Sequence, residues 1–223
     1  MIPDPAVNIW AQTKNSLYPL YKERAEGRLP EMDCHAQAAE IYADYSLPED
    51  RLLDAAGGSG YFFWSLKQRG LLGHYHLLDQ TADFVDMGRR ALAAELPPER
   101  FIVSSMQETP GRYEAVFCLN ALFCLPDYRQ GLERLLMAAG RLIILRSTFG
   151  ERNEIRYETD PYLDPGAERL KSYFNIWRVA EVTAFMESYG FAVHTVVDRR
   201  TNDQPEISAG KLFPWRWLVG VKS

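Results

Sequence analysis

The sequence is poor in cysteine and has no cysteine or histidine motif with metal-binding spacing. Its three cysteines, Cys34, Cys118 and Cys124, form no CxxC or Cys/His pattern, and an odd number does not indicate a disulfide framework. This usage fits a reducing compartment, so we expect a cytoplasmic protein. His74 and His76 alternate on a predicted strand, but no further ligands accompany them. We therefore predict no metal site.

Long hydrophobic runs and an excess of positive charge are also missing. The longest apolar run, residues 115–125, is interrupted by Asn120 and is too short to span a bilayer. The first residues lack the basic and apolar parts of a secretory signal. The formal net charge is -5, and Lys and Arg are scattered as short pairs. We expect no membrane segment and a small-molecule partner rather than a nucleic acid.

What the chain contains is the composition of an ordinary globular domain. It has 223 residues, of which 47% are hydrophobic and 25% charged. This length suits one α/β domain with a small embellishment, and two full domains would be cramped.

A glycine-rich stretch after an apolar strand is the most informative segment. Residues 51–60 run through Leu52 and Leu53 to the acidic Asp54 and then to three glycines within four residues, before an aromatic-rich helix begins. Glycines allow positive φ and let a ligand lie directly against the main chain. The order strand, acid, glycine turn and helix predicts a nucleoside-binding site. The alternative is a glycine-rich turn of no chemical use.

Strands and helices then alternate, with predicted strands at 74–79, 100–104, 114–119 and 141–147. This alternation predicts a parallel sheet with helices on both faces. Asp79 ends the second strand about 25 residues after Asp54, which is typical of a ribose-binding acid. Ser105 and Asn120 follow the third and fourth strands, so we expect their side chains at the same edge of the sheet.

The two ends of the chain and one insertion depart from the alternation. Residues 1–47 are predicted to form an N-terminal helical cover, with a first helix that Pro19 interrupts. Residues 148–177 exceed a normal connection, so we assign them to substrate recognition, the alternative being a structural excursion with aromatic anchors. Residues 191–197 and 213–221 are predicted to form an antiparallel pair at one side of the sheet.

His35 lies in the first turn of a second predicted helix of the cover. It is either a polar group at the mouth of the glycine-turn pocket or a surface histidine at a helix start.

Taken together, residues 31–223 resemble the class I S-adenosylmethionine-dependent methyltransferases. The resemblance is carried by Asp54-Ala-Ala56-Gly-Gly58-Ser-Gly60, the second acid Asp79 and the antiparallel ending. It implies a doubly wound, mostly parallel, seven-stranded Rossmann-like sheet with an antiparallel C-terminal strand, here in a domain at 48–223. Ala56 stands where glycine is usual. Because alanine allows close approach when φ is negative, we expect cofactor binding to survive.

Dinucleotide oxidoreductases are the main rival for such a turn. Counting from Gly58, their Gly-x-Gly-x-x-Gly pattern would require glycine at position 63, where the chain has Phe63. The register therefore speaks against a pyrophosphate-binding turn.

The resemblance also implies a set of S-adenosylmethionine contacts at the turn and at the strand ends. Asp54 is expected at the ammonium group of the cofactor, Asp79 at both ribose hydroxyls, and Ser105 and Met106 beside the adenine. The full set of expected cofactor-binding residues is Asp54, Ala56, Gly57, Gly58, Gly60, Asp79, Gln80, Ser105, Met106, Leu119 and Asn120.

Methyl transfer by in-line displacement mainly needs positioning and exclusion of water. No residue identifies itself as a general base, and His35, Asn120, Tyr173 and Asn175 are the candidates near the acceptor. We expect a small-molecule acceptor methylated on nitrogen or oxygen, such as a sugar or a natural-product intermediate. The alternatives are a non-catalytic S-adenosylmethionine-binding protein and a methyltransferase acting on RNA or protein.

Overall fold

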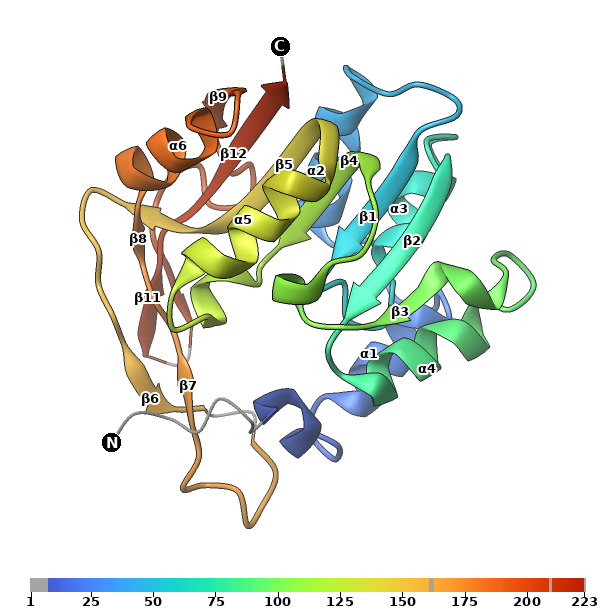
Figure 1. The fold of residues 1–223 in the computed structure, drawn as a ribbon. Coiled ribbons are helices and arrows are strands. Elements are labelled where there is room, and N and C mark those ends of the chain that lie inside the picture. The colour runs from blue at the N-terminus through green and yellow to red at the C-terminus, as the bar shows by residue number, and fades with distance from the viewer. Residues whose placement is uncertain (1–7, 161–162, 209, 223) are drawn as a thin grey trace.

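A twisted central sheet organises the molecule (Figure 1). The structure is a computed structural model and describes residues 8–160, 163–208 and 210–222. The strand order is β3-β2-β1-β4-β5-β12-β9, and β12 runs in the opposite direction to the other six strands. The predicted mostly parallel sheet with an antiparallel C-terminal strand is confirmed. The strands on this path are β1 (Arg51–Ala55), β2 (His74–Asp79), β3 (Phe101–Val103), β4 (Tyr113–Leu119), β5 (Ala139–Gly150), β9 (Phe191–Val196) and β12 (Trp215–Lys222).

Helices cover both faces of this sheet, as the near-continuous apolar strands require. In β4, Ala115 and Phe117 belong to the core on one face, and Val116 and Cys118 belong to the core on the other. A strand buried on both faces is typical of a parallel sheet between two helical layers. The first layer holds α2 (Asp33–Ala43), α3 (Phe62–Lys67) and α4 (Ala82–Ala91), and the second holds α5 (Tyr128–Ala138) and α6 (Val179–Glu187) (Figure 1). None of the described helices combines the length and hydrophobicity needed to cross a membrane.

The N-terminal segment contains a short 3-10 helix, η1 (Ile9–Gln12), and one α-helix, α1 (Tyr18–Ala25). Pro19 was expected to interrupt a longer helix, but it lies in the first turn of α1, where its missing N–H needs no partner. Helix α1 packs against α4, and the Tyr21 ring stacks on Phe84 with 4.4 Å between centroids. Residues 1–7 of the predicted cover lie outside the described residues.

The predicted insertion at 148–177 begins later than expected, because β5 continues to Gly150. It forms an antiparallel ribbon of β6 (Tyr157–Thr159) and β7 (Lys171–Tyr173) and returns through the short β8 (Trp177–Arg178), which pairs with the end of β5. Residues 161–162 of the insertion lie outside the described part. A second ribbon consists of β10 (Glu206–Ser208) and β11 (Lys211–Phe213). An aromatic cluster joins the ends of these segments and contains Phe123, Phe174, Phe213 and Trp215.

Candidate functional site

The glycine turn lies at the carboxyl end of β1, in the centre of the sheet. Gly58 and Gly60 have φ values of 59° and 75°, in the left-handed region that favours glycine. A Cβ atom on Gly58 would lie 2.8 Å from Cε1 of Tyr21, and one on Gly57 would lie 2.3 Å from Oδ2 of Asp54. The close packing above and below the turn therefore excludes side chains at both positions.

Ala56 adopts the same left-handed conformation, with φ of 56°. The expectation that the cofactor site tolerates this alanine assumed a negative φ, and that assumption is wrong. A non-glycine residue in this region costs about 1–2 kcal/mol. The turn thus keeps the shape that glycine would give it, at the expense of local strain.

Asp79 ends β2 directly beside the turn. Its carboxylate is 7% exposed and accepts hydrogen bonds from two backbone N–H groups, that of Gly58 at 2.9 Å and that of Thr81 at 2.8 Å. Burial raises the pKa of Asp79, and these hydrogen bonds partly oppose the rise. The neighbouring Gln80 is exposed. The structure brings the second acid and the glycine turn into direct contact, as the sequence predicts.

Asp54 is buried next to the turn. It is 2% exposed, and Oδ2 accepts the hydroxyl of Tyr75 at 2.6 Å. Burial raises the pKa of Asp54 to about 7, although the Tyr75 hydrogen bond opposes the rise. In this position Asp54 braces the turn against β2. Its contact with a cofactor ammonium group stays a prediction.

The ends of β3 and β4 supply the next wall of the site. Ser105 is half-buried and precedes the 3-10 helix η3 (Met106–Glu108). Met106 is buried in the core, with its sulfur 3.7 Å from Sγ of Cys118, so its side chain packs away from the strand ends. Leu119 is 8% exposed at the end of β4, and Asn120 follows it with φ of 61°.

Asn120 is held by a buried arginine that the sequence analysis did not select. Arg146 lies near the carboxyl end of β5; its Nη1 donates to Oδ1 of Asn120, and its carbonyl oxygen accepts the Asn120 N–H at 2.8 Å. Its Nε donates to Oδ2 of Asp198 at 2.6 Å. The one available signal was an arginine directly after the apolar run 142–145 at a strand end.

His35 is 5% exposed, so the second of the two alternatives, a surface histidine at a helix start, is wrong. Its ring stacks on Tyr61, the residue that follows the glycine turn, with 4.6 Å between centroids. Burial lowers the pKa of His35 to about 3, with smaller contributions from Arg24 and Arg146. The imidazole is therefore neutral at physiological pH.

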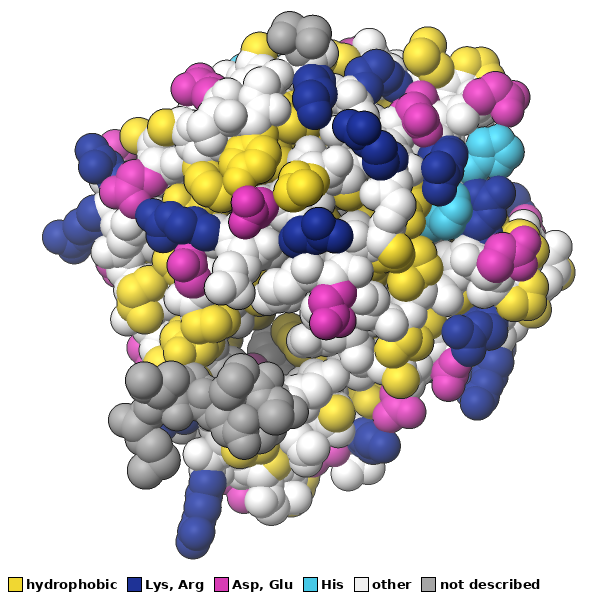
Figure 2. Space-filling model, in the orientation of Figure 1, with side chains coloured by type: hydrophobic (Ala, Val, Ile, Leu, Met, Phe, Trp, Pro, Cys, Tyr) yellow, Lys and Arg dark blue, Asp and Glu magenta, His cyan; other side chains and the backbone are white. Residues whose placement is uncertain are grey.

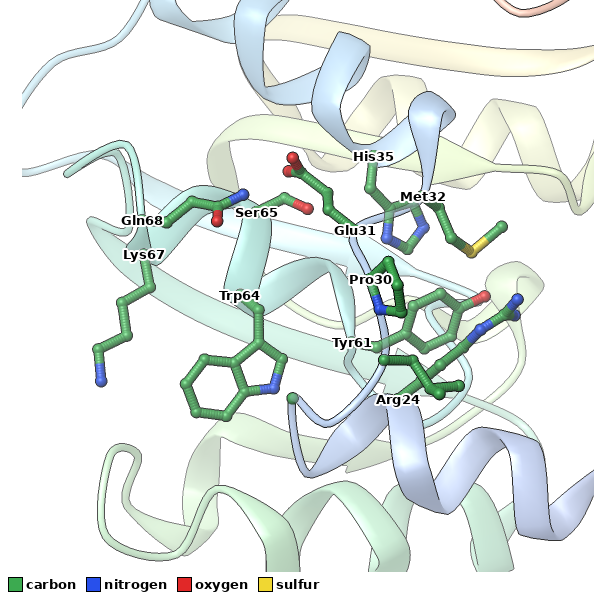
Figure 3. A pocket seen from close by; sticks show the side chains of 12 residues that line it. Arg24, Pro30, Glu31, Met32, His35, Tyr61, Trp64, Ser65, Lys67 and Gln68 are labelled. Atoms are coloured by element: carbon green, nitrogen blue, oxygen red, sulfur yellow. The ribbon is translucent and has the colours of Figure 1, made fainter.

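A cavity of roughly 420 Å³ opens beside His35, between the end of α1, the start of α2 and helix α3. Figure 3 shows the His35 and Tyr61 rings side by side, with the Arg24 side chain reaching over Tyr61 and the Trp64 indole on the opposite wall. The distance from the Arg24 guanidinium carbon to the Tyr61 ring centroid is 5.3 Å. The cavity mixes aromatic and cationic walls, and it extends from the residue that follows the glycine turn.

Tyr173 and Asn175 are not brought to these residues by any contact that the structure describes. The Tyr173 ring packs on Tyr157 within the β6–β7 ribbon, 4.7 Å between centroids. The Asn175 amide is already engaged, accepting the N–H of Arg156 at 2.9 Å and donating to the carbonyl of Leu125 at 2.7 Å. Asn175 is 0% exposed and fastens the insertion to the segment at Leu125, so it is not presented to a substrate.

Helix α1 closes over the turn from above. The Ser59 hydroxyl donates to the carbonyl of Tyr21 at 2.9 Å, and the Tyr21 ring meets Tyr61 edge-on at 5.6 Å. Burial raises the pKa of Tyr21 to about 12, and the nearby Asp79 adds to the rise. Figure 2 shows a hollow in the surface at this carboxyl edge of the sheet. Within the described residues, no group of three or more acidic, histidine or cysteine side chains could hold a metal ion.

A doubly wound sheet with a glycine turn and an acid at the ends of its central strands is the architecture of Rossmann-like domains, in which ligands bind at this edge of the sheet. No protein-family model matches the sequence, and no curated protein matches it. Solved structures do match it. Magnesium protoporphyrin IX methyltransferase (ChlM) from Synechocystis PCC 6803, with bound S-adenosylmethionine, has 16% identity and a TM-score of 0.60, over 99% of this chain and 100% of that one.

Two further methyltransferases show the same likeness. CcbJ from Streptomyces caelestis has 15% identity and a TM-score of 0.63, over 95% of this chain and 98% of that one. The glycopeptide N-methyltransferase MtfA, complexed with S-adenosylmethionine, has 13% identity and a TM-score of 0.57, over 85% and 94%. The chain therefore has the fold of the S-adenosylmethionine-dependent methyltransferases.

Proposed function

We propose that this protein is an S-adenosylmethionine-dependent methyltransferase that acts on a small molecule through nitrogen or oxygen. The observation that carries the proposal is the carboxylate of Asp79, fixed by the N–H groups of Gly58 and Thr81 at the edge of a glycine turn. In this fold that position suits an acid that binds ribose hydroxyls. ChlM and MtfA, which share the fold, were both crystallised with S-adenosylmethionine.

The residues present fit this cofactor. Asp79 would accept the two ribose hydroxyls, and Ser105 and Leu119 would border the adenine. The methionine arm would lie along the turn at 56–60 once the Tyr21 ring, which packs against Gly58, moves aside. The rings of Tyr21 and Tyr61 meet over the turn, where aromatic faces stabilise a sulfonium by cation–π attraction. When bound, S-adenosylmethionine supplies a methyl group already activated by the positive charge on sulfur. The chain then has to orient the acceptor and exclude water.

The acceptor is proposed to be small. The net charge of -5 disfavours an extended nucleic-acid footprint. ChlM acts on a porphyrin and MtfA on a glycopeptide. We assign the cover at 1–47 and the insertion at 148–177 to the walls of the acceptor site, and a sugar or a natural-product intermediate suits a site of this kind. Free cysteines at 34, 118 and 124 suit a reducing cytoplasm.

Calorimetry with S-adenosylmethionine and S-adenosylhomocysteine tests the cofactor site. We expect both to bind the unaltered protein, and Asp79→Asn to weaken binding about tenfold or more, because a charge-assisted hydrogen bond contributes about 1.5–3 kcal/mol. The matched control is Asp86→Asn, which removes an exposed carboxylate paired with Arg89 on the outside of α4. Absence of binding, or equal binding by the Asp79 and Asp86 variants, would contradict the proposal.

A non-catalytic S-adenosylmethionine-binding protein is the second candidate. The observation that favours it is the neutral, buried His35, which leaves this wall of the site without a base that is effective at neutral pH. Methyl transfer from labelled S-adenosylmethionine to any member of a metabolite mixture would eliminate this candidate.

A further inference from the structure

Arg146 is the most deeply buried cation of the described residues that lies at the carboxyl edge of the sheet. It is 2% exposed, and its partner Asp198 is 0% exposed. Asp198 uses only Oδ2 for the arginine, because Oδ1 accepts the N–H and the hydroxyl of Thr201, both at 3.1 Å. The ion pair therefore occupies Nε of the guanidinium and leaves the terminal nitrogens for other partners.

One terminal nitrogen determines how Asn120 faces the site. Because Nη1 of Arg146 donates to Oδ1 of Asn120, the Asn120 amide has only its NH₂ group left to present. The current partner of that group is Sγ of Cys34, 3.7 Å away, which is a weak acceptor. Asn120 stands in a left-handed conformation directly after β4 and is in effect a hydrogen-bond donor.

The other terminal nitrogen, Nη2, is buried and has no hydrogen-bond partner within the described residues. A buried donor without a partner lowers the stability of the fold unless another group accepts its hydrogen bond. The guanidinium lies 4.3 Å from the ring centroid of Trp215, and that ring stacks on Phe213. This corner thus combines an unpaired donor on Arg146 and a weakly engaged donor on Asn120 with the aromatic pair Trp215 and Phe213.

The same corner offers little to remove a proton. The neighbouring His35 has a pKa of about 3, lowered by burial first and by the charges of Arg24 and Arg146. Burial raises the pKa of the adjacent Tyr61 well above its usual range. A hydroxyl or ammonium acceptor would have to lose a proton, whereas a carboxylate is already ionised at neutral pH and needs no base.

We propose that the acceptor is a carboxylate on a flat apolar skeleton, bound by Nη2 of Arg146 and Nδ2 of Asn120. This inference rests on the proposed methyltransferase function, which it deepens by naming the acceptor class. A carboxylate oxygen forms a bond to the methyl carbon, and the carbon–sulfur bond breaks with its electron pair passing to sulfur. The products are a methyl ester and a neutral thioether, and no proton is released.

Binding of matched probes tests the site without relying on turnover. Benzoate, cinnamate and naphthoate are each compared with the corresponding amide by calorimetry, with and without saturating S-adenosylhomocysteine. We expect the carboxylates to bind about tenfold or more tightly than the amides, the factor that a charge-assisted contact gives. Equal binding of acid and amide, or no binding by any carboxylate at millimolar concentration, would overturn the proposal.

Two variants and one control test which residues cause the preference for carboxylates over amides. Asn120→Asp keeps the size of the side chain and its tolerance of positive φ but turns a donor into an anion, so it should abolish the preference for carboxylates. Arg146→Lys should reduce it if the variant folds. Arg141→Lys alters the other arginine–aspartate pair on β5 and should leave it intact. If the Asn120→Asp variant still preferred carboxylates, Arg146, Asp198 and Asn120 would have a purely structural role and the proposal would be refuted.

Proton stoichiometry supplies the last readout. In a weakly buffered indicator assay, methylation of a carboxylate releases no proton, whereas methylation of an ammonium or hydroxyl group releases one. One proton per methyl group transferred would overturn the carboxylate assignment and leave the methyltransferase function standing. If S-adenosylmethionine fails to bind while the acid preference persists, the proposed function fails and the anion site remains.

Discussion

Strand β5 carries two arginines, and each pairs with a buried aspartate. The two pairs differ in which guanidinium nitrogen is left without a hydrogen-bond partner. At the amino edge, Nη2 of Arg141 donates to Asp50 at 2.6 Å and Nη1 donates to the carbonyl of Tyr45 at 2.6 Å. Asp50 also accepts the hydroxyl of Tyr42 and the N–H of Leu47. Both terminal nitrogens of this arginine are used, and its unpaired buried atom is Nε.

At the carboxyl edge, the Arg146–Asp198 pair is buried more deeply and leaves a terminal nitrogen unpaired. It also holds Asn120, which has a positive φ. Buried polar groups that lack a hydrogen-bond partner within the protein concentrate at sites where a ligand supplies that partner. The amino-edge pair acts as a structural staple between β5 and the end of α2, whereas the carboxyl-edge pair faces the proposed site.

Removing the aspartates should give the largest difference between the two edges. Asp198→Ala leaves an arginine that is 2% exposed without its counter-ion, which should lower the free energy of unfolding by about 3–5 kcal/mol. Asp50→Ala should cost less, about 2–3 kcal/mol, because the Arg141 side chain is 29% exposed and can be hydrated. Urea denaturation measures both values.

A compensating change sharpens this test. Arg146→Met in the Asp198→Ala background removes the uncompensated charge, so the double variant should be more stable than Asp198→Ala alone. Equal losses of unfolding free energy for Asp198→Ala and Asp50→Ala would show that the deeper burial of the Arg146–Asp198 pair has no effect on stability.

A smaller effect is expected from pH. Burial raises the pKa of Asp54 at the carboxyl edge to about 7, so the folded state binds a proton that the unfolded state has already lost. The contribution of Asp54 to stability should therefore fall by about 2.5 kcal/mol as the pH rises from 5 to 8. The buried His35, whose pKa is lowered to about 3, contributes a change of opposite sign in the same range, so the Asp54 effect is the difference between two profiles. Asp54→Asn can still accept the Tyr75 hydroxyl, and its stability should rise more steeply with pH than that of the unaltered protein.

Thermal unfolding of the cofactor-free protein at several pH values measures the effect, with Asp86→Asn as an exposed control. An Asp54→Asn profile that is parallel to that of the unaltered protein would show that Asp54 is not a costly buried acid.

The sheet was predictable from the sequence because local signals agree with the global fold. Apolar runs mark the strands themselves. The glycine turn and Asp79 lie at strand ends, where a parallel sheet gathers its functional groups. The reach of β5 to Gly150 was not predictable, since its last residues 148–150 pair with distant Pro214, Trp215 and β8.

The side chains of the site were less predictable, because their roles depend on contacts between distant segments. His35 looks like a surface histidine in the sequence, yet it is buried through its stacking on Tyr61. Arg146 and Asp198 are 52 residues apart, and no local pattern pairs them. The left-handed φ of Ala56 was likewise invisible, since alanine usually has a negative φ.

The measurement that tests the central claim most directly is an amide NMR titration with S-adenosylhomocysteine. If the carboxyl edge is the cofactor site, the backbone amides of Gly58, Thr81 and Asn120 should shift, while that of Leu47 at the amino edge should stay unchanged. Shifts confined to the amino edge, or no shifts at saturating ligand, would contradict the assignment.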